Sequence, residues 1–159
     1  MPEWDQLLDG YEATVDWPAS AFWSELSAAY PDAVVLLSMR KSSEVWWNSI
    51  SQTIFHDLDH EPSERDALRA MFLDLLRARF TDRWDNPDVA MAAYVLHCDA
   101  VRAGVPSERL VRWQPEDGWQ PICTALGLPV PNNAFPHRNT FEEYWDYWNG
   151  DGPVPPGQP

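Results

Sequence analysis

Apolar positions along this chain follow two patterns, which together predict alternating helices and strands. A spacing of three to four residues is typical of helices with one buried face. It predicts helices over residues 4–12, Pro18–Tyr30, Ser43–Phe55, Ser63–Phe80, Pro87–Arg102, Gly118–Leu126 and His137–Trp148. Apolar runs predict strands over Ala33–Ser38 and Arg109–Trp113, and a brief strand over Ala13–Val15. This order indicates an α/β fold with a short parallel sheet and predominantly helical content.

Several element boundaries are marked by residues with local preferences. Ser42 or Ser43 can cap the third helix, Asn86 precedes Pro87 at the start of another, and Gly127 can close the last one before the turn-rich segment. The stretch His56–Glu61 is polar and acidic, and it predicts a loop. The unbroken apolar character of Ala33–Ser38 further predicts a strand that is covered on both faces.

The end of this strand is the most informative position in the chain. Arg40 and Lys41 follow it, and two serines then begin a helix. In α/β proteins the carboxyl ends of strands and the amino ends of helices converge, and backbone N–H groups there favour anions. We therefore expect a phosphate or sulfate group to bind at this point.

Composition narrows the classes of ligand. The 159 residues carry a formal net charge of −14, from 11 basic and 25 acidic side chains. A nucleic-acid backbone or an anionic membrane surface requires a basic face, so we expect neither as a partner. An anionic ligand must then bind where the few basic side chains are concentrated. The ten tryptophans are numerous enough to line a cleft as well as to fill a core.

Cysteine and histidine positions suggest neither a disulfide framework nor a metal centre. Cys98 and Cys123 form no CxxC pair, no apolar run is long enough for a membrane span, and no signal peptide is visible, so we expect a cytoplasmic protein. His56 and His60 have acidic neighbours, but a loop offers no defined ligand geometry. No metal is therefore expected.

A set of short fragments follows in a defined order along most of the chain. The early fragments are Asp16-Trp17-Pro18, Phe22-Trp23, Tyr30-Pro31-Asp32-Ala33 and, after Arg40, Trp46-Trp47-Asn48-Ser49-Ile50. The later ones are Arg112-Trp113-Gln114-Pro115-Glu116-Asp117-Gly118-Trp119, Leu126-Gly127-Leu128-Pro129-Val130-Pro131 and Phe135-Pro136-His137-Arg138-Asn139-Thr140. Each fragment is short, but in this order and spacing they together resemble the bacterial sulfotransferase-like proteins of the P-loop nucleoside triphosphatase superfamily. The resemblance implies a single, partial three-layer sulfotransferase-like domain over residues 1–149. The Pro/Gly-rich composition of residues 150–159 predicts a tail that is disordered or loosely docked.

The resemblance also implies an activity. It is the transfer of a sulfuryl group from 3′-phosphoadenosine 5′-phosphosulfate to a hydroxyl or amine of a small-molecule acceptor. In such proteins an Arg at the strand end and a Ser in the next helix hold the 3′-phosphate, and these roles fall on Arg40 and Ser49. Such proteins also have a basic loop, late in the chain, that contacts the same phosphate. That role falls on Arg138, with Asn139 as a weaker donor. From the residues alone, Arg40 can equally cap a strand, Ser49 can be merely exposed, and Asn139 can cap a helix.

The acceptor must lose its proton to a base in this reaction. Related sulfotransferases often place a His before the Arg-bearing strand, whereas this chain has Asp16 there. A pocket beside Trp17 could raise the pKa of Asp16 and make it the base; the other interpretation is a turn residue before Pro18. Lys41 stands where such proteins commonly carry Asp. This difference either strengthens anion binding or is a surface variation without a role in binding.

A Gly-rich phosphate loop is missing from the sequence. Such a loop needs a strand, a Gly-rich turn and a helix with a basic residue, yet Gly10 is the only glycine before position 100. We expect a family member that begins after its first βα unit, with impaired transfer and an exposed sheet edge open to self-association. The alternative is a non-catalytic α/β binding or protein-interaction module.

Overall fold

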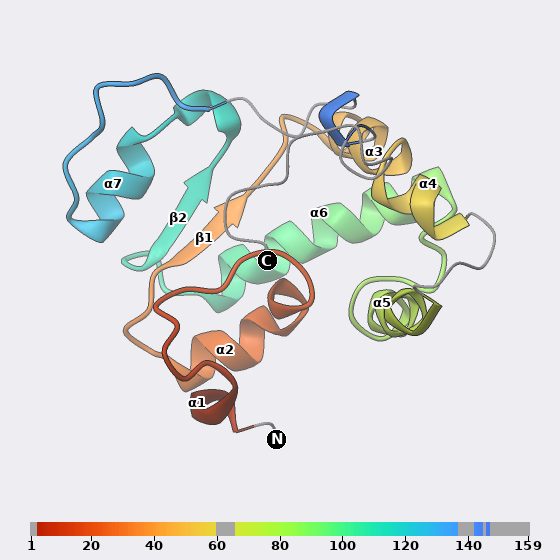
Figure 1. Cartoon of the computed structure of the whole chain (residues 1–159), viewed down its shortest axis with the longest axis horizontal. Coiled ribbons are helices and arrows are strands. Elements are labelled where there is room, and N and C mark those ends of the chain that lie inside the picture. Colours follow the sequence, from red (N-terminus) through yellow and green to blue (C-terminus); the bar gives the residue numbers. More distant parts are fainter. Residues whose placement is uncertain (1–2, 60–65, 137–141, 145, 147–159) are drawn as a thin grey trace.

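A computed structural model of the chain describes residues 3–59, 66–136, 142–144 and 146 (Figure 1). The elements in order are α1 (Trp4–Leu7), the 3-10 helix η1 (Ala19–Phe22), α2 (Trp23–Ala29), β1 (Val35–Ser38), α3 (Ser43–Ser51), α4 (Ile54–Asp59), α5 (Asp66–Arg79), α6 (Pro87–Gly104), β2 (Leu110–Trp113), the 3-10 helix η2 (Pro115–Asp117) and α7 (Gln120–Leu126). Among the described residues the two strands form one parallel sheet. The predicted α/β class, with a short parallel sheet and mostly helical content, is therefore confirmed.

The two strands pair in a register that brings their carboxyl ends together. Val35 lies opposite Leu110, and Ser38 lies opposite Trp113. One residue further on, the Met39 amide donates to the Trp113 carbonyl at 2.8 Å. The helices α3 to α6 lie between the strands in sequence, as a parallel connection requires.

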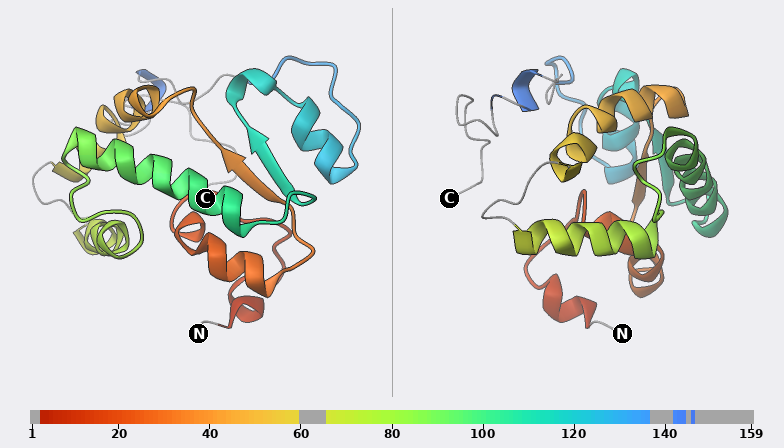
Figure 2. Two further views of the ribbon diagram at one scale, coloured as in Figure 1. Left: turned by 180° about the vertical axis from the view of Figure 1, so that it is seen from behind. Right: turned by 90° about the vertical axis from the view of Figure 1, so that its right-hand side faces the viewer.

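Helix α6 is the centre of the molecule. In Figures 1 and 2 it extends from the sheet and α2 at one end to α3, α4 and α5 at the other. Its carboxyl half packs on the sheet through a buried cluster of Leu37, Cys98, Val101 and Val105. Its amino half supplies Ala90 to a second buried cluster with Phe55, Leu58 and Leu76. The side chains packed against this second cluster are Trp17, Trp46, Trp47, Ile50, Ile54, Phe72, Leu73, Phe80 and Trp84.

Only one face of β1 is well covered by the described residues. Leu37 faces α6 and is 6% exposed, whereas Leu36, on the opposite face, is 45% exposed. The prediction of a strand covered on both faces is therefore wrong for the described part of the chain. Apolar character alone cannot distinguish a doubly covered strand from one with an apolar but open face.

Several predicted boundaries also differ from the structure. Helix α1 ends at Leu7, and residues 13–15 form no strand; Val15 is 90% exposed. A segment of three residues becomes a strand only where a partner supplies hydrogen bonds. The predicted loop over His56–Glu61 is helical as far as Asp59, because α4 packs Phe55 and Leu58 into the core. The third predicted helix is divided into α3 and α4 by a turn at residues 52–53.

Candidate functional site: an anion hollow beside the strand end

The chain leaves β1 and enters α3 over four residues, and one long-range and one local hydrogen bond set this path. The Arg40 backbone N–H donates to the Tyr94 hydroxyl of α6 at 2.9 Å. Ser42 then caps α3, because its Oγ accepts from the Val45 backbone N–H at 3.3 Å. The predicted cap is confirmed, and it directs α3 away from the strand end with Arg40 on the connecting segment.

A hollow of about 180 Å³ lies beside this connection. The described residues that line it are Arg40, Trp46, Ser49, Ile50, Thr53 and Ile54. The members from Trp46 to Thr53 recur at helical spacing, so they share one flank of α3 and the turn after it. Thr53 Oγ1 donates to the Ser49 carbonyl at 2.9 Å. The hollow thus combines one guanidinium, two hydroxyl groups and an apolar wall.

The hollow differs from the predicted site in its position on α3. The sequence predicted binding at the amino end of the helix, through backbone N–H groups. That end is occupied by the protein itself: Ser42 accepts from Val45, and hydrogen bonds from Ser42 and from its own backbone lower the pKa of Glu44. Arg40 and Ser49 therefore line a hollow on the flank of the helix rather than at its first turn.

Within the described part of the chain, Arg40 differs from most basic side chains in having no partner. Arg77, Arg79 and Arg102 pair with carboxylates. Among the described residues, the Arg40 guanidinium makes no hydrogen bond or ion pair, although its charge helps to lower the pKa of Glu116. An exposed guanidinium beside hydroxyl groups is suited to a phosphate or sulfate group.

Lys41 has a partner at the strand end. Its Nζ lies 3.0 Å from Glu116 Oε1, in η2 directly after β2. The Lys41 hydrogen bond is the largest of the causes that lower the pKa of Glu116. Lys41 therefore contributes less free positive charge to the hollow than its sequence position suggests.

Asp16 lies in the turn before η1. It is exposed, its φ is 63°, and its Oδ1 accepts from the Trp17 backbone N–H at 2.7 Å. Its carbonyl accepts from the Ser20 amide at 2.8 Å, as a turn residue does. Asp16 is not among the described residues that line the hollow. The adjacent Trp17 packs on the same buried cluster as Trp46.

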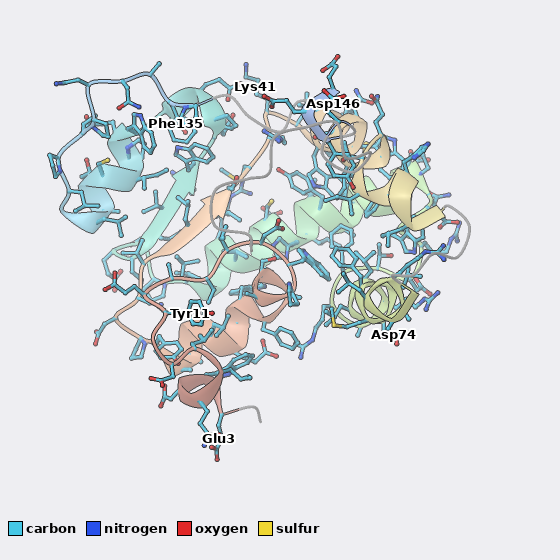
Figure 3. All side chains as sticks on the ribbon, viewed as in Figure 1. Glu3, Tyr11, Lys41, Asp74, Phe135 and Asp146 are labelled. Atoms are coloured by element: carbon cyan, nitrogen blue, oxygen red, sulfur yellow. The ribbon has the colours of Figure 1, made fainter. Side chains whose placement is uncertain are left out.

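The late segment returns to the end of the molecule where the strands stop. Trp119 Nε1 donates to the Asn133 carbonyl at 3.1 Å, and the Phe135 ring packs on Trp113 and Trp119. Figure 3 shows Lys41, Phe135 and Asp146 along this same end. Arg138 and Asn139, the two donors expected between Phe135 and Asp146, lie outside the described residues.

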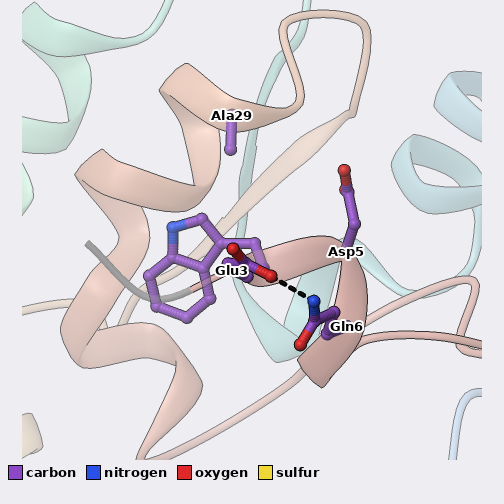
Figure 4. A pocket seen from close by; sticks show the side chains of 5 residues that line it. Glu3, Asp5, Gln6 and Ala29 are labelled. Atoms are coloured by element: carbon purple, nitrogen blue, oxygen red, sulfur yellow. Dashed lines mark hydrogen bonds between the residues drawn. The ribbon is translucent and has the colours of Figure 1, made fainter.

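A second, larger hollow of about 400 Å³ is unsuited to an anion. It lies at α1 and is lined by Glu3, Trp4, Asp5, Gln6 and Ala29 (Figure 4). Its two carboxylates already accept hydrogen bonds from Gln6 and Tyr30. Negative side chains repel phosphate, so this hollow is not a second candidate for the same ligand.

Two further features concern metal binding and membrane crossing. The described part of the chain contains no group of three or more His, Cys, Asp or Glu side chains arranged to hold a metal ion. In the same part, no helix has both the length and the apolar character that a membrane crossing requires. His97 lies within α6 against the edge of Trp23, and burial lowers its pKa.

The fold and this hollow define an α/β protein with a candidate anion site at a strand end. Residues 1–144 match the family described as "Sulfotransferase domain". The chain is also 31% identical over 175 residues to Ava biosynthesis cluster protein M of Aspergillus versicolor. The chain belongs to the sulfotransferase domain family, and the resemblance seen in the sequence is confirmed. That alignment covers 92% of this chain and 64% of the relative, so the chain spans about two thirds of the relative's length.

The sequence predicts Arg40 and Ser49 as site residues, but it does not predict the other residues that line the hollow. The helical spacing from Trp46 through Ile50 to Thr53 was a signal that could have found three of them. Tyr94 had no such signal, because it lies 54 residues from Arg40 in the sequence.

Proposed function

We propose that this chain is a sulfotransferase-family protein for which 3′-phosphoadenosine 5′-phosphosulfate is the sulfuryl donor. The acceptor is a hydroxyl or amine of a small molecule. The hollow beside β1 binds the 3′-phosphate of the donor, through the Arg40 guanidinium and the Ser49 hydroxyl. The observation that supports this most is that the Arg40 guanidinium, which has no partner among residues 3–59, 66–136, 142–144 and 146, lines the same hollow as the Ser49 hydroxyl.

The residues present fit this group in charge, size and polarity. A phosphate needs donors, which Arg40 and Ser49 provide, and the hollow of about 180 Å³ is large enough for it. Trp46 and Ile50 add apolar surface that suits the nucleoside next to the phosphate. A local cation is also required here, because the net charge of −14 repels a polyanion elsewhere.

Three further residues complete the proposed site. We assign Arg138 and Asn139 as additional phosphate donors, which is supported by the position of Phe135 at the end where β2 stops (Figure 3). We assign Asp16 as the base that takes the proton of the acceptor. The position of Asp16 next to Trp17, which packs on the same cluster as Trp46, supports this assignment.

Transfer by this chain alone is impaired in our proposal. The 159-residue sequence contains no Gly-rich loop that could hold the 5′-phosphosulfate, so its own residues supply only the 3′-phosphate half of the site. The compartment we propose is the cytoplasm, where thiols stay reduced; Cys98 and Cys123 are both buried and unpaired.

Calorimetry with adenosine 3′,5′-bisphosphate tests the proposal. The wild-type chain should bind this ligand more tightly than it binds adenosine 5′-phosphate, which lacks the 3′-phosphate. Arg40→Ala should weaken bisphosphate binding by about 1.5 to 3 kcal/mol, the range for a charged hydrogen bond, and Ser49→Ala by about 1 kcal/mol. The matched control is Arg77→Ala, which removes an exposed arginine on α5 and should change nothing. Equal affinity for the two nucleotides would contradict the proposal.

A non-catalytic interaction module is the second candidate, and the open edge of β1 favours it. Within the described residues β1 pairs only with β2, and Val35 and Met39 direct their N–H groups to that strand. Alternation along a strand then directs the Leu36 and Ser38 N–H groups to the other side. An open edge of this kind can pair with a second copy of the chain.

Sedimentation measures this self-association. The apparent mass should rise with protein concentration, and more steeply at high salt, because salt screens the repulsion between copies of charge −14. Ser38→Pro should suppress the rise without breaking a bond to β2, because proline removes only the outward N–H. A monomer at every concentration and salt level would exclude edge pairing.

A further inference from the structure

We propose that Tyr94 is a positioning residue for Arg40, and that its hydroxyl holds the connecting segment so that the Arg40 side chain faces the hollow. The inference rests on the proposed function of the hollow. It adds to that function a residue of α6 that neither touches the hollow nor lies near Arg40 in the sequence.

The first argument is the bond to the backbone of Arg40. Tyr94 Oη accepts from the Arg40 N–H at 2.9 Å, directly after the last bond between β1 and β2. From Arg40 to the Ser42 cap the chain is otherwise a loop, and the Arg40 side chain has no partner among the described residues. A fixed backbone reduces the number of directions in which the free guanidinium can point, so less entropy is lost when an anion binds.

The second argument is the contact between Tyr94 and the wall of the hollow. The rings of Tyr94 and Trp46 stack with centroids 4.7 Å apart and planes 13° from parallel. Trp46 lines the hollow, so one side chain of α6 both supports the wall of the hollow and bonds to the backbone of Arg40. Burial is the main reason that the pKa of Tyr94 is raised, so the hydroxyl keeps its proton around neutral pH.

Tyr94→Phe separates these two contributions, because it removes the hydroxyl and keeps the ring stacked on Trp46. Calorimetry with adenosine 3′,5′-bisphosphate should show affinity weakened by roughly threefold to tenfold, the value of one hydrogen bond. The matched control is Tyr30→Phe, which removes a hydroxyl that donates to Asp5 at 2.8 Å in α1. It should leave the affinity unchanged.

A double-mutant cycle distinguishes positioning from a general loss of structure. Arg40→Ala removes the side chain that Tyr94 positions but keeps the backbone N–H that donates to the Tyr94 hydroxyl. Adding Tyr94→Phe to Arg40→Ala should then cost less affinity than it costs in the wild-type chain, because the two residues act together. A merely structural Tyr94 would give equal, additive losses in both backgrounds, and this would overturn the inference.

Amide exchange at Arg40 gives a readout that needs no ligand. Tyr94→Phe should speed exchange of the Arg40 amide proton, while Tyr30→Phe should not. Unchanged exchange, or unchanged bisphosphate affinity in Tyr94→Phe, would overturn the role of Tyr94 and leave the proposed function standing. If the wild-type chain does not bind the bisphosphate, the proposed function fails first, and the positioning role fails with it.

Discussion

Replacing Arg109 by alanine should destabilise the fold strongly, because one side chain joins three elements. The Arg109 guanidinium donates to the Ser27 carbonyl at 3.0 Å, to Ser27 Oγ at 2.7 Å and to the Ala33 carbonyl at 3.2 Å. It thereby holds the end of α2 and the segment before β1 to the start of β2. Ser27 is only 7% exposed, so the substitution leaves a buried hydroxyl without this donor.

The magnitude follows from the kind of bond. A hydrogen bond to a charged group contributes about 1.5 to 3 kcal/mol when it is buried, and Arg109 is only partly buried. We therefore expect a loss of about 3 kcal/mol for the set of bonds. In a chain of this length each kcal/mol lowers the melting temperature by about 2–4 °C, so the shift should be about 6–12 °C.

Urea unfolding followed by tryptophan fluorescence measures this loss. Arg77→Ala is the control, because its pair with Asp74 is exposed on α5 and should contribute less than about 0.5 kcal/mol. Arg109→Lys should recover little stability, because an ammonium group cannot reach the three acceptors in the geometry of a guanidinium. A loss below about 1 kcal/mol for Arg109→Ala would refute the reasoning.

Two further predictions concern charge. Glu116→Gln frees Lys41 at the strand end and should strengthen binding of adenosine 3′,5′-bisphosphate by about twofold to fivefold at low salt, because the freed ammonium group attracts the anion. Calorimetry at high salt should show a smaller gain, and weaker binding would contradict this prediction. Burial lowers the pKa of His97 below its usual 6.5, so the unfolded chain takes up the proton first as the pH falls. The stability from neutral His97 is therefore present above about pH 6.5 and is lost as the pH falls towards the lowered folded pKa. Urea midpoints at about pH 7.5 and about pH 5.5 should differ less in His97→Gln than in the wild type, and equal differences would exclude His97 as the cause.

Local signals in the sequence were sufficient to predict those parts of the structure that depend on interactions between neighbouring residues. The Asn86 cap is confirmed, because Asn86 Oδ1 accepts from the Val89 backbone N–H at 3.1 Å. Gly127 ends α7 with a φ of 66°, as its lack of a side chain allows. Both strands could also be predicted, because each combines an apolar run with flanking breakers.

Local signals failed where burial or pairing decides the structure. The segment Ala13–Val15 has strand-like composition but no partner strand within the described residues. His56 and Asp59 look polar enough for a loop, yet they belong to α4, because Phe55 and Leu58 of the same segment are buried. A polar pattern cannot show that its few apolar members will dock on another helix.

For the candidate site, the sequence by itself determined the chemical components, and the tertiary structure decided their arrangement. Arg40 and Ser49 were predicted because a strand, a basic pair and a capped helix follow one another within a short segment. Only the folded chain shows that they share a hollow on the flank of α3, that Glu116 engages Lys41, and that Tyr94 contacts the Arg40 backbone. The physical reason is distance along the chain. Capping and helical spacing act within one or two turns, whereas Tyr94 and Glu116 reach the strand end only when α6 and β2 pack against β1.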